Sequence, residues 1–178
     1  ESDLKDLGMH TELCSDAYLS LYKAGKLTNR RKSIDKGKGV FGCAVGSSEL
    51  YEWLDDNHGI AAYPLEYVNR PSVIAQIDNM VSINSCVSVD LYGQVAAESS
   101  GSRQISGTGG QLDFLIGASA SRGGKAFICM SSVYKDKKGI YHSRIRPQFD
   151  GDIITSPRSQ VYFLATEYGA INLEGRST

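Results

Sequence analysis

Short apolar runs, each bounded by glycine or polar turns, limit the folds that this chain can form. The clearest run, VFGCAVG at residues 40–46, is typical of a buried strand, and none approaches the roughly 20 apolar residues of a membrane-spanning helix. Helix-like segments follow the early runs, whereas the second half holds mainly strand-like runs. The pattern predicts an α/β fold with a largely parallel or mixed sheet flanked by helices.

Local signals locate the expected elements. Helices are predicted at residues 16–24, 47–56, 70–79 and 111–121, with Ser15 and either Ser47 or Ser48 as N-caps, Gly25 after the first helix, and Pro71 in the first turn of the third. Extended segments are predicted at residues 40–46, 61–68, 80–98, 125–133, 142–149 and 161–169, with a turn at Tyr92 and Gly93.

The composition bounds the classes of partner. A chain of 178 residues corresponds to one domain, residues 1–178, and its net charge of −1 creates no field that would recruit nucleic acid or a membrane surface. The basic cluster Arg30, Arg31 and Lys32 is interpreted as a solvated turn. The four cysteines form no C-x-x-C pair, so we expect neither zinc nor disulfides. No signal peptide is evident, and we expect a cytoplasmic protein.

Polar groups follow several of the expected strands. Glu12 follows LGMHT, Asn69 follows LEYV, Glu167 follows YFLAT, and a glycine turn begins at Gly107. Ligands of open α/β sheets gather beyond the carboxyl ends of the strands, which makes these positions candidates for a binding site.

Several motifs have alternative interpretations. GKGVFG at residues 37–42 matches a dinucleotide-binding pattern but precedes a strand, and GGKAF at residues 123–127 lacks the hydroxyl of a P-loop, so both are rejected. SGTGGQLDF at residues 106–114 is either a plain tight turn or a loop whose backbone N–H groups face an anion. A nucleophilic pair of Cys14 and His10 is disfavoured because Cys14 leads into a helix and the core. No cluster has metal-ligand spacing.

Six phrases together resemble a known family: LGMHTELCSD, YVNRP, DNMVSINS, VDLYGQV, SGTGGQLDF and ATEYGAINLEG. They are similar, in order and over residues 4–175, to the C-terminal half of the acetyl-CoA hydrolase/transferase family. The likeness is greatest to its 4-hydroxybutyrate and butyryl-CoA:acetate CoA-transferase branch. The resemblance implies a CoA-transferase-like (NagB/RpiA type) domain, with an N-terminal domain and a terminal helical tail outside this sequence.

The resemblance also implies roles for individual residues. Glu12 of the HTE motif would be the catalytic nucleophile, and Asn69 would lie beside the substrate carboxylate. The backbone N–H of Gly110 would face the thioester oxygen. Glu167 would lie near the glutamate–CoA site, and Gly107 and Gly109 would shape the CoA-facing loop.

The implied reaction is transfer of CoA from an acyl-CoA to a free carboxylate through a glutamyl-CoA thioester, without metal or redox cofactor. The partners would be acyl-CoA, the carboxylate acceptor, the N-terminal domain of the same chain, and further copies in a homo-oligomer. Two alternatives stay open: an acyl-CoA hydrolase, in which water intercepts the thioester, and a CoA-binding module without chemistry. The sequence departs from the family pattern at Leu13 and Cys14 and in the long, basic segment at residues 134–141.

Overall fold

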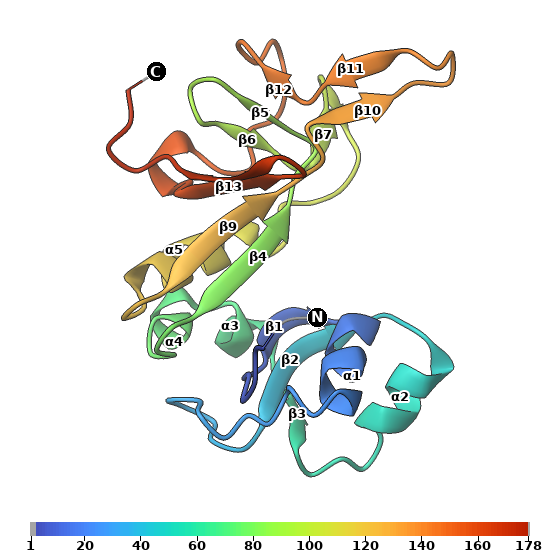
Figure 1. Ribbon diagram of the computed structural model, residues 1–178, viewed down its shortest axis with the longest axis vertical. Helices are drawn as coiled ribbons and strands as arrows, with labels where there is room; N and C mark the ends of the chain where they lie inside the picture. The colour runs from blue at the N-terminus through green and yellow to red at the C-terminus, as the bar shows by residue number, and fades with distance from the viewer. Residues whose placement is uncertain (1–2, 178) are drawn as a thin grey trace. The chain divides into compact units, whose positions relative to one another are not determined.

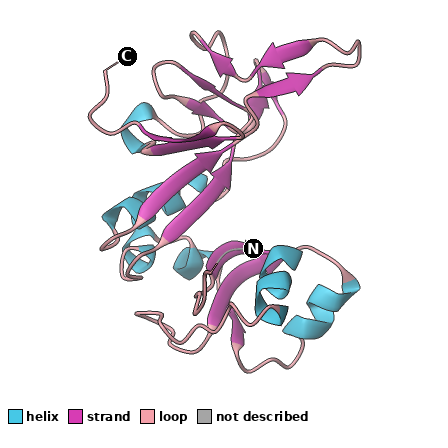
Figure 2. Ribbon diagram, in the orientation of Figure 1, coloured by secondary structure: helices cyan, strands magenta, loops and turns pink. Residues whose placement is uncertain are grey.

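The computed structural model describes residues 3–177, and the chain divides into two compact units, Glu1–Asp78 and Asn79–Thr178. Both units combine strands with helices (Figure 2), and the main sheet is parallel in the first unit and mixed in the second, which confirms the predicted α/β class. In the described part of the chain, no helix has the length and apolar character needed to cross a membrane.

The first unit is built on a parallel sheet with strand order β1-β2-β3 (Figure 1). Its strands are β1 (His10–Cys14), β2 (Gly39–Ala44) and β3 (Ile60–Ala62), and its helices are α1 (Asp16–Lys23), α2 (Ser48–Leu54), α3 (Leu65–Val68) and α4 (Pro71–Ile74). Met9, Cys14, Leu19, Leu27 and Leu50 form a buried apolar cluster between the strands and helices α1 and α2. Burial of these side chains is the main stabilising contribution in this unit.

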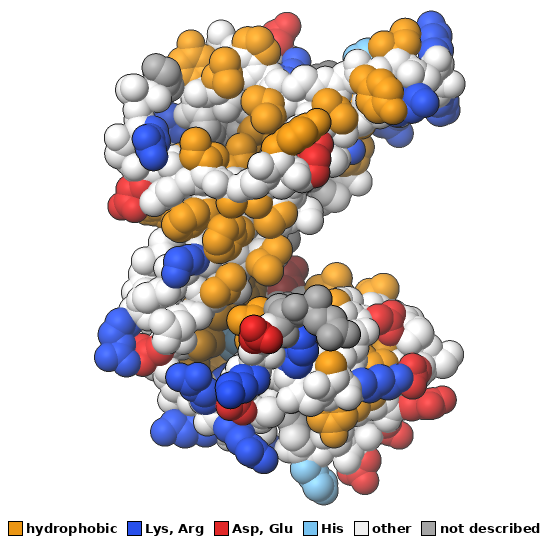
Figure 3. Space-filling model, in the orientation of Figure 1, with side chains coloured by type: hydrophobic (Ala, Val, Ile, Leu, Met, Phe, Trp, Pro, Cys, Tyr) orange, Lys and Arg blue, Asp and Glu red, His pale blue; other side chains and the backbone are white. Residues whose placement is uncertain are grey.

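The second unit contains a four-stranded mixed sheet with order β14-β13-β9-β4, in which the pairing of β13 with β14 is antiparallel and the others are parallel. The strands are β4 (Val81–Ser85), β9 (Lys125–Cys129), β13 (Phe163–Thr166) and β14 (Gly169–Asn172). Helix α5 (Gln111–Ala120) packs against β9 and β4, and Ala126 and Ile128 are fully buried. In contrast, Val81 and Ile83 are exposed, and apolar side chains gather over this sheet in Figure 3.

Smaller sheets complete the second unit. They comprise β5 (Ser88–Asp90), β6 (Val95–Ala96) and β12 (Ile145–Arg146) in one sheet, the hairpin of β7 (Ser99–Ser100) and β8 (Arg103–Gln104), and the hairpin of β10 (Val133–Lys135) and β11 (Tyr141–Ser143); a 3-10 turn, η1, spans Arg158–Gln160. Gly93, at φ +83°, forms the predicted turn between β5 and β6. The basic segment at residues 134–141 forms the end of the hairpin, because β10 pairs with β11 on either side of it.

Two departures from the predicted element boundaries lie next to the candidate site. Residues 61–68, expected as one extended segment, split into β3 and helix α3 because Pro64 ends the strand and caps the helix. The helix expected at residues 70–79 contains only α4, after which Gln76 and Ile77 continue in tighter i→i−3 turns. Ser47 caps α2 as predicted, with Oγ accepting a hydrogen bond from the Leu50 N–H at 3.3 Å.

Candidate functional site

Glu12 lies inside strand β1, which corrects the prediction that it follows the end of a strand. The parallel pairing with β2 continues to Cys14 opposite Ala44, so the strand extends two residues beyond Glu12. Side chains alternate along a strand, and Glu12 therefore shares a face of β1 with His10. The Glu12 side chain is half-buried.

Asn69 is brought directly to Glu12. Its Nδ2 donates a hydrogen bond to Oε2 of Glu12 at 2.8 Å. Asn69 is the C-cap of helix α3 and does not end a strand, which corrects the second predicted position. The proline at residue 64, before Leu-Glu-Tyr, was the signal in the sequence that could have indicated this helix.

Gly42 explains how α3 comes so close to the strands. A Cβ on Gly42 would overlap Cδ2 of Leu65, the first residue of α3, and would lie 3.2 Å from the carbonyl oxygen of Glu12. The last glycine of the rejected GKGVFG motif therefore has a packing role, because the absence of a side chain lets the helix rest on β2 beside the Glu12 strand.

His10 is buried and contacts the same helix. Its Nε2 lies 2.8 Å from the carbonyl oxygen of Val68, and burial lowers the pKa of the imidazole. Cys14 is also buried, and burial raises the pKa of its thiol to about 11. A thiol with this pKa stays protonated at neutral pH and is a poor nucleophile, which weighs against a Cys14–His10 pair.

Lys32 is buried, which corrects the interpretation of its basic cluster as a wholly solvated turn. Its Nζ donates to the carbonyl oxygens of Met9 at 3.0 Å and Lys38 at 2.7 Å, while only 5% of the residue is exposed. The lack of a side chain on Gly8 leaves room for the Lys32 stem. Burial lowers the pKa of Lys32 to about 8. The two hydrogen bonds of its ammonium group connect the start of β1 to the segment that leads into β2.

The glycine turn lies in the second unit, immediately before helix α5. Gly110 is the N-cap of α5, and Gly109 has φ +54°, a conformation that favours glycine. The loop is anchored upstream because the Ile105 N–H donates to the carbonyl oxygen of Glu98 at 2.8 Å. An anion at this end of α5 would lie near the first N–H groups of the helix, which have no partner within the helix itself.

Glu167 directly follows strand β13, as predicted. Its carboxylate accepts hydrogen bonds from Ser132 Oγ at 2.6 Å and from the Ser132 N–H at 2.8 Å. These hydrogen bonds hold the pKa of Glu167 below its ordinary value, so the group is ionised at neutral pH. Glu167 therefore fastens the end of β13 to the loop after β9. Glu12 and Asn69 belong to the first unit, whereas Glu167 and the three glycines belong to the second.

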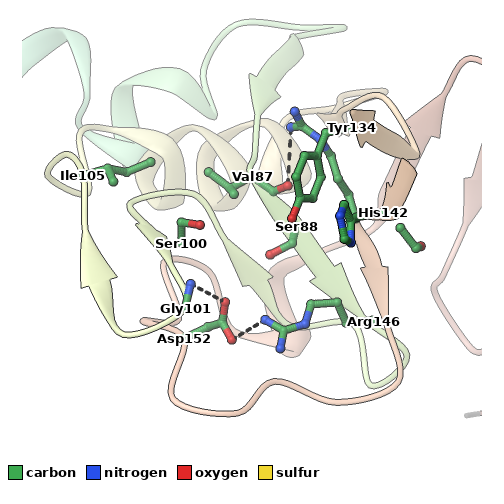
Figure 4. Close-up of a pocket in the computed structure, with 11 residues that line it drawn as sticks. Val87, Ser88, Ser100, Gly101, Ile105, Tyr134, His142, Arg146 and Asp152 are labelled. Carbon is green, nitrogen blue, oxygen red and sulfur yellow. Dashed lines mark hydrogen bonds and ion pairs between the residues drawn. The ribbon is translucent and has the colours of Figure 1, made fainter. Parts of the chain in front are cut away.

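A cationic pocket of about 710 Å³ opens in the second unit (Figure 4). The residues that line it are Val87, Ser88, Ser100, Gly101, Ile105, Tyr134, His142, Ser143, Arg144, Arg146 and Asp152. Ile105 connects it to the glycine turn, because Gly107 follows two residues later in the chain. The pocket was not predicted from the sequence: Arg144 lies at the bend between β11 and β12, and Arg146 lies in β12.

The charged groups of the pocket differ in their partners. Arg146 Nη1 donates to Asp152 Oδ2 at 2.6 Å, and this pair neutralises itself. Arg144 lies over the ring of Tyr134 at 5.7 Å and makes a long hydrogen bond to the Val87 carbonyl oxygen at 3.5 Å. Its Nε is buried and has no hydrogen-bond partner among residues 3–177. Because Arg144 lines the pocket, an anion there could contact the part of its guanidinium that is not buried.

Known proteins match this chain closely. The family described as "Acetyl-CoA hydrolase/transferase C-terminal domain" matches residues 46–178. The chain is 57% identical over 178 residues to the probable butyrate:acetyl-CoA coenzyme A-transferase of Syntrophomonas wolfei, covering 99% of this chain and 40% of that protein. It is 46% identical over 174 residues to the 4-hydroxybutyrate coenzyme A transferase of Clostridium kluyveri, covering 97% and 40%.

A solved structure agrees. RipA from Yersinia pestis superposes with a TM-score of 0.90 at 44% identity, over 98% of this chain and 39% of that one. The present chain thus spans about two fifths of the length of these relatives. The matched family region begins after Glu12, but the two curated relatives align over almost the whole chain. The predicted resemblance is confirmed, and the chain belongs to the acetyl-CoA hydrolase/transferase family.

Proposed function

We propose that the full-length protein is an acyl-CoA:carboxylate CoA-transferase in which Glu12 is the nucleophile. The observation that carries the proposal is the Glu12–Asn69 pair: a half-buried carboxylate whose Oε2 receives an amide hydrogen bond at 2.8 Å. A carboxylate is a weak nucleophile, so it must be held in an attacking geometry, and the Asn69 amide restricts its rotation. The names of similar proteins, which include a butyryl-CoA:acetate CoA-transferase, make butyrate, 4-hydroxybutyrate and acetate the first carboxylates to test.

The reaction would run through two acyl exchanges. A Glu12 oxygen attacks the thioester carbonyl, the C–S bond breaks, and a mixed anhydride forms with release of CoA thiolate. The thiolate then attacks the glutamyl carbonyl of the anhydride, which frees the donor carboxylate and leaves a glutamyl-CoA thioester. An acceptor carboxylate reverses the two steps and regenerates Glu12.

The second unit would supply oxyanion and CoA contacts. The N–H of Gly110 is the proposed donor to the oxyanion, and one such donor contributes about 3 kcal/mol to the transition state. Gly107 and Gly109 would let the loop before α5 approach CoA closely. Glu167, which is hydrogen-bonded to Ser132 in the loop after β9, would lie near the glutamyl-CoA site. The Arg144 pocket is the proposed site for the CoA phosphates, because guanidinium groups bind phosphate oxygens in pairs.

The test uses the full-length protein with butyryl-CoA, with and without acetate. A transferase forms acetyl-CoA only when acetate is present and releases little free CoA, whereas a hydrolase releases free CoA in both cases. Borohydride treatment during turnover followed by peptide mass analysis should locate the reduced residue at Glu12. Modification of Cys14 with an unmodified Glu12 would contradict the proposal, and absence of both products would favour a CoA-binding module.

A further inference from the structure

We infer that His10 is a positioning residue for Glu12, acting through the end of helix α3 and Asn69; the inference rests on the proposed function of Glu12. His10 and Glu12 lie two residues apart on one face of β1. His10 bonds to the carbonyl of Val68, and Glu12 bonds to the amide of Asn69, the next residue. The strand and the helix end are thus joined at two consecutive points.

The imidazole must donate in this contact. A carbonyl oxygen has no hydrogen to give, so the proton of the His10–Val68 hydrogen bond resides on Nε2. Only 6% of His10 is exposed, and burial lowers its pKa, which favours the neutral ring at pH 7. The nearby charges oppose one another: Lys32 lowers the pKa and Asp35 raises it.

Helix α3 needs such an anchor because it is short. It contains four residues, and a helix of this length is not stable by its own hydrogen bonds. The carbonyls at its end have no partner within the helix, and the His10 donor satisfies that of Val68. Gly42 lets Leu65 pack against β2 at the other end of the helix. His10 therefore fixes the position, relative to β1, of Asn69, the C-cap residue whose side chain holds Glu12.

Loss of the His10 donor should change the position of the Asn69 side chain more than the stability of the protein. Without the donor, α3 can stay folded by the packing of Leu65, but the Asn69 amide is free to shift relative to Glu12. Displacement of a reacting group by a fraction of a bond length slows the chemical step and leaves the binding of acyl-CoA nearly unchanged. The predicted signature is a lower kcat with an unchanged KM.

The experiment uses the full-length protein with butyryl-CoA and acetate, and measures kcat, KM, borohydride labelling of Glu12 and the unfolding temperature. His10→Phe keeps a ring without a donor, His10→Asn shortens the reach of the donor, and His10→Gln keeps a donor of similar reach. We expect kcat to fall on the order of tenfold in the first two variants, with recovery to within about threefold in His10→Gln. The exposed His58→Phe is the matched control and should behave as wild type.

A double-mutant cycle tests the route through Asn69. If His10 acts through Asn69, His10→Asn should cost little further kcat in an Asn69→Ala background. Independent, multiplicative losses would overturn the inference, as would a folded His10→Phe and His10→Asn with wild-type kcat. Wild-type protein that neither transfers CoA nor labels at Glu12 would overturn the proposed function, and the positioning role with it.

Discussion

The two units of the chain hold their candidate groups by opposite means. In the first unit a side chain in a regular strand is held by another side chain, as Glu12 is by Asn69. In the second, the candidate groups are backbone N–H donors on the turn before α5 and cations around a pocket. Covalent chemistry requires a positioned side chain, whereas recognition of phosphates and oxyanions can use backbone donors. Under the proposed function, the first unit would form the covalent bond and the second would stabilise charge.

The largest effect is expected at Glu12. Glu12→Gln keeps the shape and can still contact Asn69, but it removes the charge and the nucleophilic oxygen, so transfer should fall by several orders of magnitude. Steady-state formation of acetyl-CoA from butyryl-CoA and acetate measures the loss, and binding of butyryl-CoA should persist. Transfer activity retained in Glu12→Gln would remove the first unit from the chemistry.

The next effect is expected at the glycine turn. Gly110→Val should lower kcat by about a hundredfold, because the branched side chain displaces the N–H donor and blocks close approach of the thioester. Gly110 has φ −88°, a conformation open to valine, but the residue is buried, so the unfolding temperature of Gly110→Val is measured together with kcat.

Gly109→Val is the matched comparison for this turn. Gly109 has φ +54°, and a branched residue there is strained, so its unfolding temperature should fall as well. A folded Gly110→Val with unchanged kcat would show that this donor takes no part in the reaction.

A smaller effect is expected in the pocket. Arg144→Gln should raise the KM for acyl-CoA about tenfold, equivalent to one charge-assisted hydrogen bond, with kcat nearly unchanged. The salt dependence of KM should also weaken because one cation is lost. Exposed Arg158 serves as the control through Arg158→Gln. Equal KM values for the two variants would place the CoA phosphates elsewhere.

The sequence predicts the elements of this fold better than their exact ends. The strand at β2, the cap of α2 and helix α5 follow from local signals: an apolar run, a serine before a helix, and a glycine turn. The position of Glu12 within β1 could not be read locally, because the length of β1 is set by its pairing with β2, far along the chain.

The candidate site shows the same division. The resemblance to the family named Glu12 and Asn69, but their hydrogen bond depends on helix α3, which forms where an extended segment was expected. The burial of Lys32 and the pocket around Arg144 arise from tertiary packing. The sequence of a basic cluster does not show which of its side chains is exposed to solvent and which is buried.

The smallest effect concerns the buried Lys32 of the first unit. Its pKa of about 8 lies below the ordinary 10.5, so between these pH values the folded state has lost a proton that the unfolded state keeps. Stability rises with pH wherever the unfolded state binds more protons, and the cost of the buried ammonium is therefore present in full below pH 8 and relieved toward 10.5.

Removing the charge through Lys32→Met should remove this contribution. The free energy of unfolding of wild type relative to Lys32→Met should increase with pH by about 1 kcal/mol, a value already reduced for screening by solvent. Urea titrations of both proteins across this window measure the difference, with the exposed Lys36→Met as control. The comparison with Lys32→Met cancels titrations common to both proteins, including that of Cys14. A difference that stays constant or shrinks as the pH rises would show that Lys32 keeps its ordinary pKa and that its two carbonyl partners offset the cost of burial.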